Sequence, residues 1–434
     1  MSFPRQLFGN LYVRLSTLSS DAVNLMGSSE TENLMSDFPP EEYASRCDRI
    51  RSIMKQQKID GLLLARPENI AYFSGFRRPS RYQFVCDILL LPRDSPPALL
   101  VPVDQRAQSE MMSWVTDIRH YVAGNRILFP ELSDATETGL KLLREFEFEK
   151  KMIGVEANPQ VSDQKSWDTF KNRLTRIREI DDLIWKLRVI KSPLEVEYVR
   201  RGCQIASTAF RKALESVHEG MTERELARTV YKTMLDEGAE DTPLAGALNV
   251  KGGSGRYAMS DTRPTDYKLR KGDIVVLDGG MPYRGYWSDI TRLTCIGTPS
   301  ARQKHMFEAC LEAETAAVNA LKPGTRISDV YRAAQETIER NGLQKNELPQ
   351  EPFGHGIGLE LHEPPFITAE SDIMLEPGMV LAIEPCLYDD QVLRSFLGSY
   401  APGGEGVFFV EDNVLITENG SENLTPISRK LNIV

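Results

Sequence analysis

The stretch KGDIVVLDGG, residues 271–280, decides how this chain folds. Its apolar run from Ile274 to Leu277 is short, rich in β-branched residues and bounded by glycines, which is typical of a buried strand rather than a helix. Asp278 ends the run, and an unpaired carboxylate is costly at the end of a buried strand. The stretch therefore predicts a strand that brings an acid into a site where it has a partner.

A second acid follows a short distance along the chain. The turn-like MPYRGY (281–286) leads into WSDITRLTCI (287–296), which predicts a second strand carrying Asp289. A hairpin between the two strands would place Asp278 and Asp289 near one another.

A second copy of this arrangement occurs closer to the C-terminus. GMVLAIEP (378–385) aligns with the first stretch on its glycine, so that Glu384 falls where the first copy has its first acid. FFVEDNVLIT (408–417) then carries Glu411 at the place of the second acid. Two half-units with acids at matching places predict one site shared by the carboxylates of both.

Such a group of carboxylates requires cations. Like charges raise one another's pKa, so the clustered acids cannot all stay ionised alone. Two divalent metal ions would bring roughly four positive charges. The apolar strands around the acids disfavour the alternative in which they merely cap strand ends. The sequence therefore predicts a dinuclear metal site.

Length and composition indicate a soluble globular protein with two or three domains. The chain has 434 residues, of which 41% are hydrophobic and 26% are charged. Its net charge of −10 argues against nucleic acid or an anionic membrane as a main partner.

The cysteines and the termini indicate the compartment. The six cysteines show no CxxC or other paired spacing, so we expect buried free thiols in a reducing compartment. No apolar run approaches the length of a membrane span, and the N-terminus lacks the hydrophobic core and cleavage site of a signal peptide. We therefore expect a cytoplasmic protein.

The pattern divides the chain into three parts. Residues 1–36 are Ser-rich and weakly patterned, and we expect them to form an N-terminal arm. In residues 37–180 strands alternate with helices, which predicts an α/β domain. Its expected helices are residues 39–57 and 136–147, and its expected strands are residues 60–65, 84–91, 98–103 and 151–157.

The third part, residues 181–434, repeats a unit of two helices and a sheet. Helices are expected at 194–217, 222–238, 301–321 and 327–342, the second opened by a capping box of Thr222 and Glu225. The copies share one register, with the matched pairs Gly220 and Gly324, Glu225 and Asp329, Leu226 and Val330, and Gly238 and Gly342. We expect a pseudo-twofold α+β domain whose halves close over one metal pair.

Several motifs resemble those of the pita-bread metallopeptidase family, which includes Xaa-Pro aminopeptidase, prolidase, methionine aminopeptidase and creatinase. In the third part they are LDGGMPYRGYWSDITR (277–292), FGHGIGLELHEPP (353–365), LEPGMVLAIEP (375–385) and VEDNVLIT (410–417). EEYASRCDRIR (41–51) and RPENIAYFSGF (66–76) are similar to the N-terminal domain of the creatinase and prolidase branch. The resemblance implies a creatinase-like α/β domain followed by a pita-bread catalytic domain.

The resemblance also implies a set of metal ligands, namely Asp278, Asp289, His355, Glu384 and Glu411. Asp289 and Glu411 would bridge two divalent ions. Asp278 would then hold one ion, with His355 and Glu384 on the other. An imidazole among hard oxygen ligands suits manganese, with cobalt, zinc or iron as alternatives, better than magnesium or calcium.

The implied chemistry is hydrolysis of an amide bond in a small peptide by a metal-dependent enzyme, which the family further implies is a homodimer. Two such ions can lower the pKa of a water between them and polarise a carbonyl. Glu384 would accept the proton of that water. His362, in HEPP (362–365), matches the family's histidine that hydrogen-bonds the substrate or tetrahedral intermediate, although it could also be a structural histidine near a turn.

Two positions depart from the proline-specific members of the family. Those members carry a histidine in a His-x-x-Pro-Thr pattern, where this chain has Asp261, and an arginine two residues before the final glutamate, where it has Phe409. We therefore expect weak activity on Xaa-Pro peptides. The candidate substrate-binding residues, which mix aromatic and charged side chains suited to a cationic or zwitterionic molecule unless they only pack, are Tyr257, Asp261, Arg263, Tyr286 and Trp287.

Two other functions fit the same fold. One is an enzyme acting on a small molecule, similar to ectoine hydrolase, creatinase or dimethylsulfoniopropionate lyase. The other is a binding protein without catalysis. The complete set of implied ligands argues against the second of these and against the metal-free mechanism of creatinase.

Overall fold

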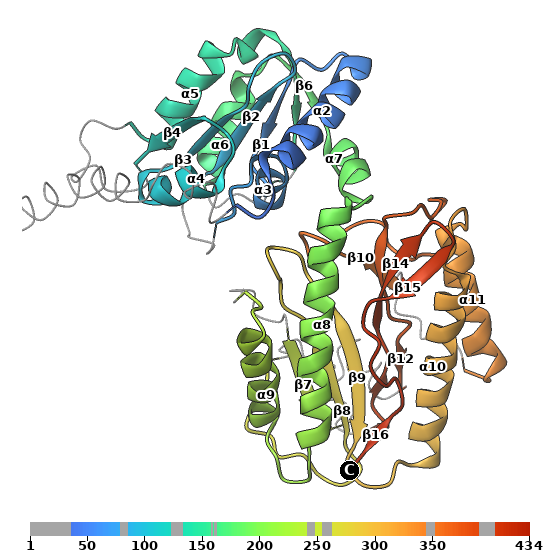
Figure 1. Ribbon diagram of the computed structural model, residues 1–434. Coiled ribbons are helices and arrows are strands. Elements are labelled where there is room, and N and C mark those ends of the chain that lie inside the picture. Colours follow the sequence, from blue (N-terminus) through green and yellow to red (C-terminus); the bar gives the residue numbers. More distant parts are fainter. Residues whose placement is uncertain are drawn as a thin grey trace, which may run out of the picture. The chain divides into compact units, whose positions relative to one another are not determined.

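The computed structural model describes residues 36–78, 86–122, 133–157, 159, 163–240, 248–253, 263–343, 352–389 and 404–434. The chain divides into two compact units (Figure 1). The first contains the described residues 36–77 and 86–179, and the second contains Arg78 and Ile180–Val434.

The first unit is a mixed sheet with helices, as the alternation of strand and helix patterns predicts. The strand order is β4-β3-β2-β1-β5-β6, with β1 antiparallel to β2 and parallel to β5. Its strands are β1 (Gly61–Leu64), β2 (Ile88–Pro92), β3 (Ala98–Pro102), β4 (Asp117–Tyr121), β5 (Met152–Val155) and β6 (Arg176–Glu179). Its helices are α2 (Pro40–Gln57), α3 (Pro67–Ser74), α4 (Arg106–Met112), α5 (Ala135–Glu145) and α6 (Gln164–Arg173).

The first half of the second unit is built around residues 271–280, KGDIVVLDGG. After α7 (Asp181–Arg188) come α8 (Pro193–Ser216), α9 (Glu223–Asp236), β7 (Leu248–Gly252), β8 (Ile274–Gly279) and β9 (Ile290–Cys295). β8 pairs antiparallel with both β7 and β9, and β16 (Asn432–Ile433) extends this sheet on the far side of β9. The capping box of Thr222 and Glu225 opens α9 as predicted.

The run of apolar residues in β8 is continuous because both faces of the strand are covered. Val275 and Leu277 pack in a core with α8 and α9, whereas Ile274 and Val276 pack in a second core with α10 and α11. A strand buried on both faces needs apolar residues at every position rather than at alternate ones.

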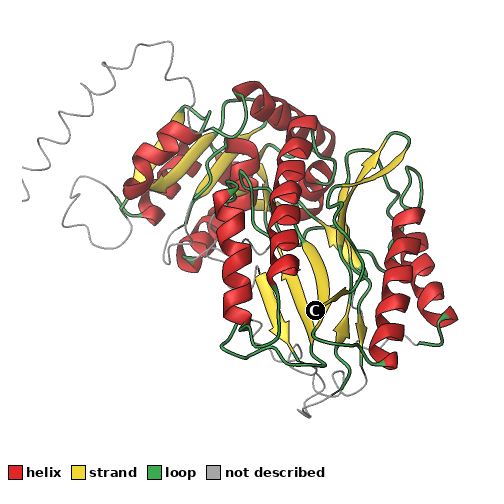
Figure 2. Cartoon of the chain, turned by 60° about the horizontal axis from the view of Figure 1, so that its bottom comes forward, coloured by secondary structure: helices red, strands yellow, loops and turns green. Residues whose placement is uncertain are grey.

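The second half repeats the first. Its helices are α10 (Ala301–Ala320) and α11 (Ile327–Arg340), and its strands are β10 (Gly354–Gly356), β11 (Val380–Ile383), β14 (Asp412–Thr417) and β15 (Gly420–Asn423) in that order across the sheet. β12 (Leu387–Tyr388) and β13 (Val407–Phe408) form a small separate pair. Seen from below, the strands of both halves lie between the helices (Figure 2).

Equivalent hydrogen bonds show that the halves are structural copies. The amide of Gly220 donates to the carbonyl of Leu269 at 2.8 Å, and in the second half Gly324 donates to Leu375 at 2.8 Å. The glycine that opens each central strand has the same left-handed backbone, with φ of 89° at Gly272 and 90° at Gly378. Only glycine adopts this conformation without strain, which explains why both copies of the motif begin with it. The fold class predicted from the repeat is confirmed.

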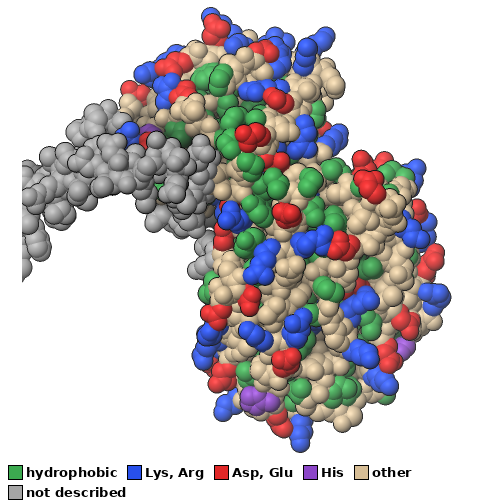
Figure 3. Space-filling model, in the orientation of Figure 1, with side chains coloured by type: hydrophobic (Ala, Val, Ile, Leu, Met, Phe, Trp, Pro, Cys, Tyr) green, Lys and Arg blue, Asp and Glu red, His purple; other side chains and the backbone are tan. Residues whose placement is uncertain are grey.

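The cysteines and the surface agree with a globular protein. The six cysteines are free, and all are buried except the half-buried Cys386. Among the described residues, no helix combines the length and the apolar character that a membrane crossing requires. Acidic and basic side chains are interspersed over the face shown in Figure 3, so the negative net charge is not gathered into one patch there.

Gly280 lies where the hairpin between β8 and β9 is tightest. A Cβ atom on Gly280 would meet the carbonyl oxygen of Ser288 at 1.9 Å, whereas one on Gly202 in α8 would meet nothing closer than 3.6 Å. We predict that Gly280→Ala lowers the midpoint of thermal unfolding of the metal-free protein by roughly 5 °C or more. The matched control Gly202→Ala should leave it unchanged or raise it, because alanine favours a helix interior. Equal midpoints for the two variants would contradict this account of the hairpin.

Candidate metal centre

Asp278 lies at the end of β8 with a partner on each neighbouring strand. Asn249 Nδ2 on β7 donates to Asp278 Oδ2 at 2.8 Å, and Thr291 Oγ1 on β9 lies 2.7 Å from Asp278 Oδ1. The ladder sets this arrangement, because Asn249 and Thr291 are the residues directly opposite Asp278 on either side. The carboxylate that the sequence placed at a strand end is therefore oriented from two sides.

Asp289 and Glu411 occupy equivalent places, because Asp289 immediately precedes β9 and Glu411 immediately precedes β14. The amide of Asp289 donates to Asn413 Oδ1 at 2.9 Å. Glu411 forms an isolated bridge with Thr291, and its Oε2 lies 2.9 Å from Thr291 Oγ1. Thr291 thus links carboxylates from the two halves of the unit, and both Asp289 and Glu411 are buried.

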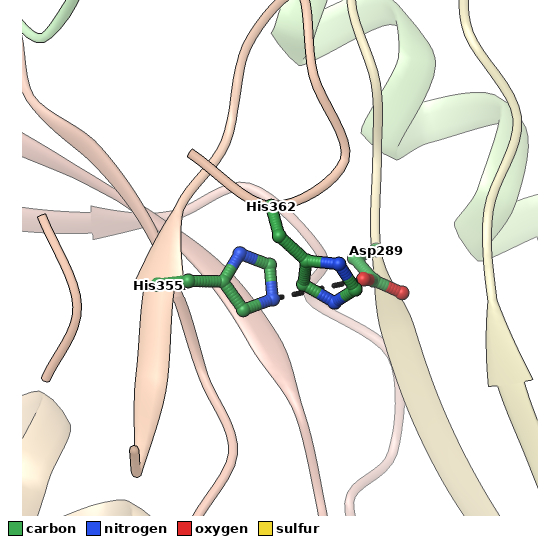
Figure 4. A group of neighbouring side chains, drawn as sticks. All are labelled: Asp289, His355 and His362. Atoms are coloured by element: carbon green, nitrogen blue, oxygen red, sulfur yellow. Dashed lines mark ion pairs between the residues drawn. The ribbon is translucent and has the colours of Figure 1, made fainter. Parts of the chain in front are cut away.

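His355 and Glu384 complete the group from the second half. His355 lies on β10, and Glu384 follows β11, the neighbouring strand. His355 Nε2 is 3.3 Å from Glu384 Oε1. The same atom is 3.8 Å from Asp289 Oδ2 (Figure 4). The other ring nitrogen, Nδ1, lies 2.9 Å from the carbonyl of Gly356, so it carries the proton and leaves Nε2 as the free lone pair.

His362 lies directly beside His355 and lines the same cavity. Its ring centroid lies 4.3 Å from that of His355 in an edge-to-face arrangement (Figure 4). A ring nitrogen of His362 lies within 4.8 Å of ligand atoms of His355 and Asp289, and His362 is only partly buried, more exposed than either. The structure therefore places His362 where it can meet a bound molecule.

Three overlapping sets of side chains here have ligand atoms within 4.8 Å of one another. They are Asp289 with His355 and His362, His355 with Glu384 and Glu411, and Asp278 with Asp289 and Glu411. Three buried atoms in these sets have no hydrogen-bond partner: Asp289 Oδ1, Glu411 Oε1 and His355 Nε2. Buried polar atoms are normally satisfied, so unpaired oxygen and nitrogen lone pairs that converge on one volume fit divalent metal ions.

The electrostatics of the site lead to the same conclusion. Burial, together with the charges of Asp278 and Glu384, raises the pKa of Asp289 well above its usual range. Burial and the neighbouring carboxylates, Asp289 foremost, also raise the pKa of Glu411. Burial lowers the pKa of His355 to about 4, so this ring is neutral at physiological pH and able to bind a metal. Because the pKa values of Asp289 and Glu411 are both raised, ionising either carboxylate costs free energy unless cations are present.

A cavity of about 440 Å³ opens over the group. Its lining combines acids and histidines with apolar side chains, including Leu361, Phe366, Tyr388 and Phe409. Its described lining is Asn249, Asp278, Gly279, Asp289, Pro352, His355, Leu361, His362, Phe366, Glu384, Cys386, Tyr388 and Phe409.

Of the five residues expected to bind substrate, the three that the structure describes do not line this cavity. Tyr286 is buried, and its hydroxyl donates to Glu195 at 2.8 Å, while Trp287 is 5% exposed. Arg263 is exposed and does not belong to the described lining. Tyr257 and Asp261 lie outside the described residues.

Sequence reasoning missed three polar residues that orient the acids: Asn249, Thr291 and Asn413. Each is a small polar residue within or beside a strand, a type common throughout the chain. Their role follows from strand register, since Asn249 and Thr291 become neighbours of Asp278 only when β7, β8 and β9 are paired. The repeat between the halves was the one signal that could have aligned these strands.

Comparison with known protein families gives two matches. Residues 197–418 match the model of metallopeptidase family M24. Residues 46–190 match the creatinase/prolidase N-terminal domain.

Individual relatives agree with these matches. The chain is 31% identical to an Xaa-Pro dipeptidase of Pyrococcus furiosus over 387 residues, which cover 89% of this chain and 99% of that protein. The solved prolidase from Pyrococcus furiosus has a TM-score of 0.69, with 87% of this chain and 100% of that one covered, at 31% identity. The Xaa-Pro dipeptidase from Bacillus anthracis has a TM-score of 0.74 at 27% identity, with 90% and 100% covered.

Asp289 belongs to two of the three overlapping sets, so its loss should affect the whole group. We predict that Asp289→Ala lowers the metal content of protein purified without chelators from about two ions per chain to nearly none, measured by plasma mass spectrometry. The control Asp266→Ala, which removes an exposed acid paired with Arg224, should keep the full content. A full complement of metal in Asp289→Ala would show that this residue bridges nothing.

Proposed function

The chain belongs to metallopeptidase family M24, and from that premise we propose that it hydrolyses Xaa-Pro bonds in small peptides with two divalent metal ions. Membership makes it a metal-dependent hydrolase. The observation that carries the proposal is the convergence of unpaired buried lone pairs from Asp289, His355 and Glu411 on one volume beside a cavity.

Asp289, His355 and Glu411 each belong to two of the three sets, but His355 offers a single free ring nitrogen and can bind only one ion, whereas a carboxylate has two oxygens. Glu411 lies within reach of His355 and Glu384 on one side and of Asp278 and Asp289 on the other. We therefore assign Glu411 and Asp289 as bridging ligands. Asp278 would hold one ion, and His355 with Glu384 would hold the other.

We propose manganese as the native metal, with cobalt, zinc or iron as alternatives. Carboxylate oxygens dominate the ligand set, which suits a hard ion, and one imidazole shifts the preference from magnesium and calcium to the first-row transition metals.

The chain's own residues then have separate tasks. Bound divalent ions supply Lewis-acid chemistry, which makes water a better nucleophile at neutral pH and polarises a carbonyl. Glu384, half-buried at the cavity, accepts the proton of the attacking water. Burial and the neighbouring His355 lower the pKa of His362 to about 4, so His362 is neutral and donates a hydrogen bond to the oxygen of the scissile carbonyl.

The apolar side chains that line the cavity determine which peptides it accepts. The relatives include Xaa-Pro dipeptidases, and a dipeptide substrate carries a free carboxylate close to the scissile bond. Among the described lining residues no lysine or arginine is available to pair with that carboxylate, and Phe366 and Phe409 face the cavity instead. We propose that this enzyme favours longer Xaa-Pro peptides, or Xaa-Pro amides, over dipeptides.

Enzymes that act on small molecules remain the second candidate on this fold, and the comparisons do not favour it. The relatives reported above are peptidases or prolidases. A non-catalytic binding protein is disfavoured because the converging ligand atoms would have no purpose there.

We also propose a cytoplasmic location and a homodimer. The six free cysteines, most of them buried, support a reducing compartment. The homodimer rests on the family resemblance, and light scattering after size-exclusion chromatography tests it.

Glu384→Gln keeps the size of the side chain and removes the proton acceptor. We predict that kcat on an Xaa-Pro peptide falls by a factor of about 10²–10⁴ while KM changes little. Metal content has to be measured alongside, so that loss of the ion is not mistaken for loss of the base. The control Glu376→Gln, at an exposed acid shortly before β11, should leave kcat unchanged. Near-normal turnover by a metal-replete Glu384→Gln variant would refute this role.

Substitutions at Phe409 test the proposed preference for longer Xaa-Pro peptides over dipeptides. We predict that the unmodified protein cleaves Xaa-Pro dipeptides poorly, and that Phe409→Arg with Asp261→His raises kcat/KM for them by up to about 10²-fold, since the variants restore hydrogen-bond donors. Phe409→Leu, which alters the same side chain without adding a charge, should bring no gain. Efficient dipeptide cleavage by the unmodified protein would show that other residues replace the missing pair.

A further inference from the structure

His362 and Glu363 are consecutive but have opposite surroundings. His362 lines the cavity, whereas the side chain of Glu363 is 1% exposed. The backbone is held at Glu363, which forms an antiparallel bridge with Gly356 and donates its amide to the carbonyl of Gly356 at 2.9 Å. A group that anchors the side chain of Glu363 therefore also restrains the backbone of the adjacent His362.

Two buried cations anchor the Glu363 carboxylate. Arg188 Nη2 lies 2.6 Å from its Oε2, and Lys191 Nζ lies 2.7 Å from its Oε1. Burial alone would raise the pKa of Glu363, but the charges of Lys191 and Arg188 outweigh burial and lower that pKa. Each carboxylate oxygen thus has its own charged donor, an arrangement that offsets the cost of removing the charges from water.

Both cations are themselves held in place. The Arg188 guanidinium lies 4.3 Å from the centre of the Trp185 ring. The amide of Lys191 donates to the carbonyl of Gly378 at 2.9 Å, next to the strand that leads to Glu384. The loop also closes tightly around the carboxylate, since a Cβ on Gly358 would meet Glu363 Oε1 at 2.6 Å. The ion cluster of Glu363, Arg188 and Lys191 therefore holds the loop that carries His362.

We propose that Glu363, held by Arg188 and Lys191, is a positioning residue that keeps His362 directed at the scissile bond. This inference rests on the proposed function, in which His362 donates a hydrogen bond to the substrate. Glu363 does not reach the cavity, so it acts through its neighbour and not on the substrate.

A double-mutant cycle tests the proposal. Lys191→Met removes one anchor, and His362→Ala removes the group that the anchor positions. With manganese and an Xaa-Pro tripeptide, we expect Lys191→Met to lower kcat by about 10- to 100-fold, as loss of an orienting partner does at metal sites, with KM little changed. In the His362→Ala background, Lys191→Met should cost almost nothing more. Additive losses would overturn the proposal, because the cluster would then act on stability alone.

The control is Lys186→Met on α7, which removes an exposed lysine 3.7 Å from Asp182. It should leave kcat at the level of the unmodified protein. If Lys191→Met fails to fold, Glu363→Gln replaces it in the cycle, because the amide keeps the size of the side chain while the charge is lost.

Hydrogen exchange gives a readout that needs no activity. Peptides covering residues 354–367 should exchange faster in Lys191→Met than in Lys186→Met, and unchanged exchange would overturn the proposal. If the unmodified protein hydrolyses no Xaa-Pro peptide, the proposed function fails, and exchange alone then decides whether the cluster holds the loop. If it hydrolyses the peptide and His362→Ala does so equally well, the positioning role fails while the proposed hydrolysis stands.

Discussion

Mutual repulsion among buried carboxylates is the constraint on which this structure depends. Burial, together with the charges of the neighbouring carboxylates, raises the pKa of both Asp289 and Glu411. A protein could relieve this by protonating the acids or by moving them into water. This chain does not move them into water, since it surrounds them with apolar strands, and in the metal-free protein their raised pKa values favour protonation. Divalent cations that displace those protons balance the charge of the oxygens that converge on one volume.

Duplication lets the fold assemble such an unfavourable group. Each half has its own helical core, so packing against helices holds the strands that carry the acids without any contribution from contacts among the acids. The halves are then joined behind the site by Arg292, which donates to the carbonyls of Thr291 at 2.9 Å and Glu411 at 2.7 Å. A further bond from Arg292, to Asp412 Oδ1 at 2.6 Å, keeps this buried cation paired. The hydrophobic cores therefore stabilise the fold, so the acids can act as metal ligands.

Much of this was predictable from sequence because the strongest patterns are those of buried strands. The glycine-bounded run before Asp278 and its copy before Glu384 gave the strands, and the family motifs gave His355. Tyr286 and Trp287 were harder, since an aromatic residue near an acid suits a pocket and a core equally well. Two features were not predictable: the role of Asn249, and the ion cluster of Glu363, Arg188 and Lys191 next to His362. Each depends on residues that meet only after strands and loops have paired.

Calorimetric titration of Mn²⁺ into chelator-stripped protein, at about pH 6 in two buffers of different ionisation enthalpy, tests the need for cations most directly. Ordinary carboxylates are already ionised at that pH, and His355, with its pKa lowered to about 4, has no proton to lose. We expect about two ions to bind per chain with a net release of protons, because the raised pKa values of Asp289 and Glu411 keep protons on the empty site. Binding without proton release, or no binding, would contradict this origin of the metal site.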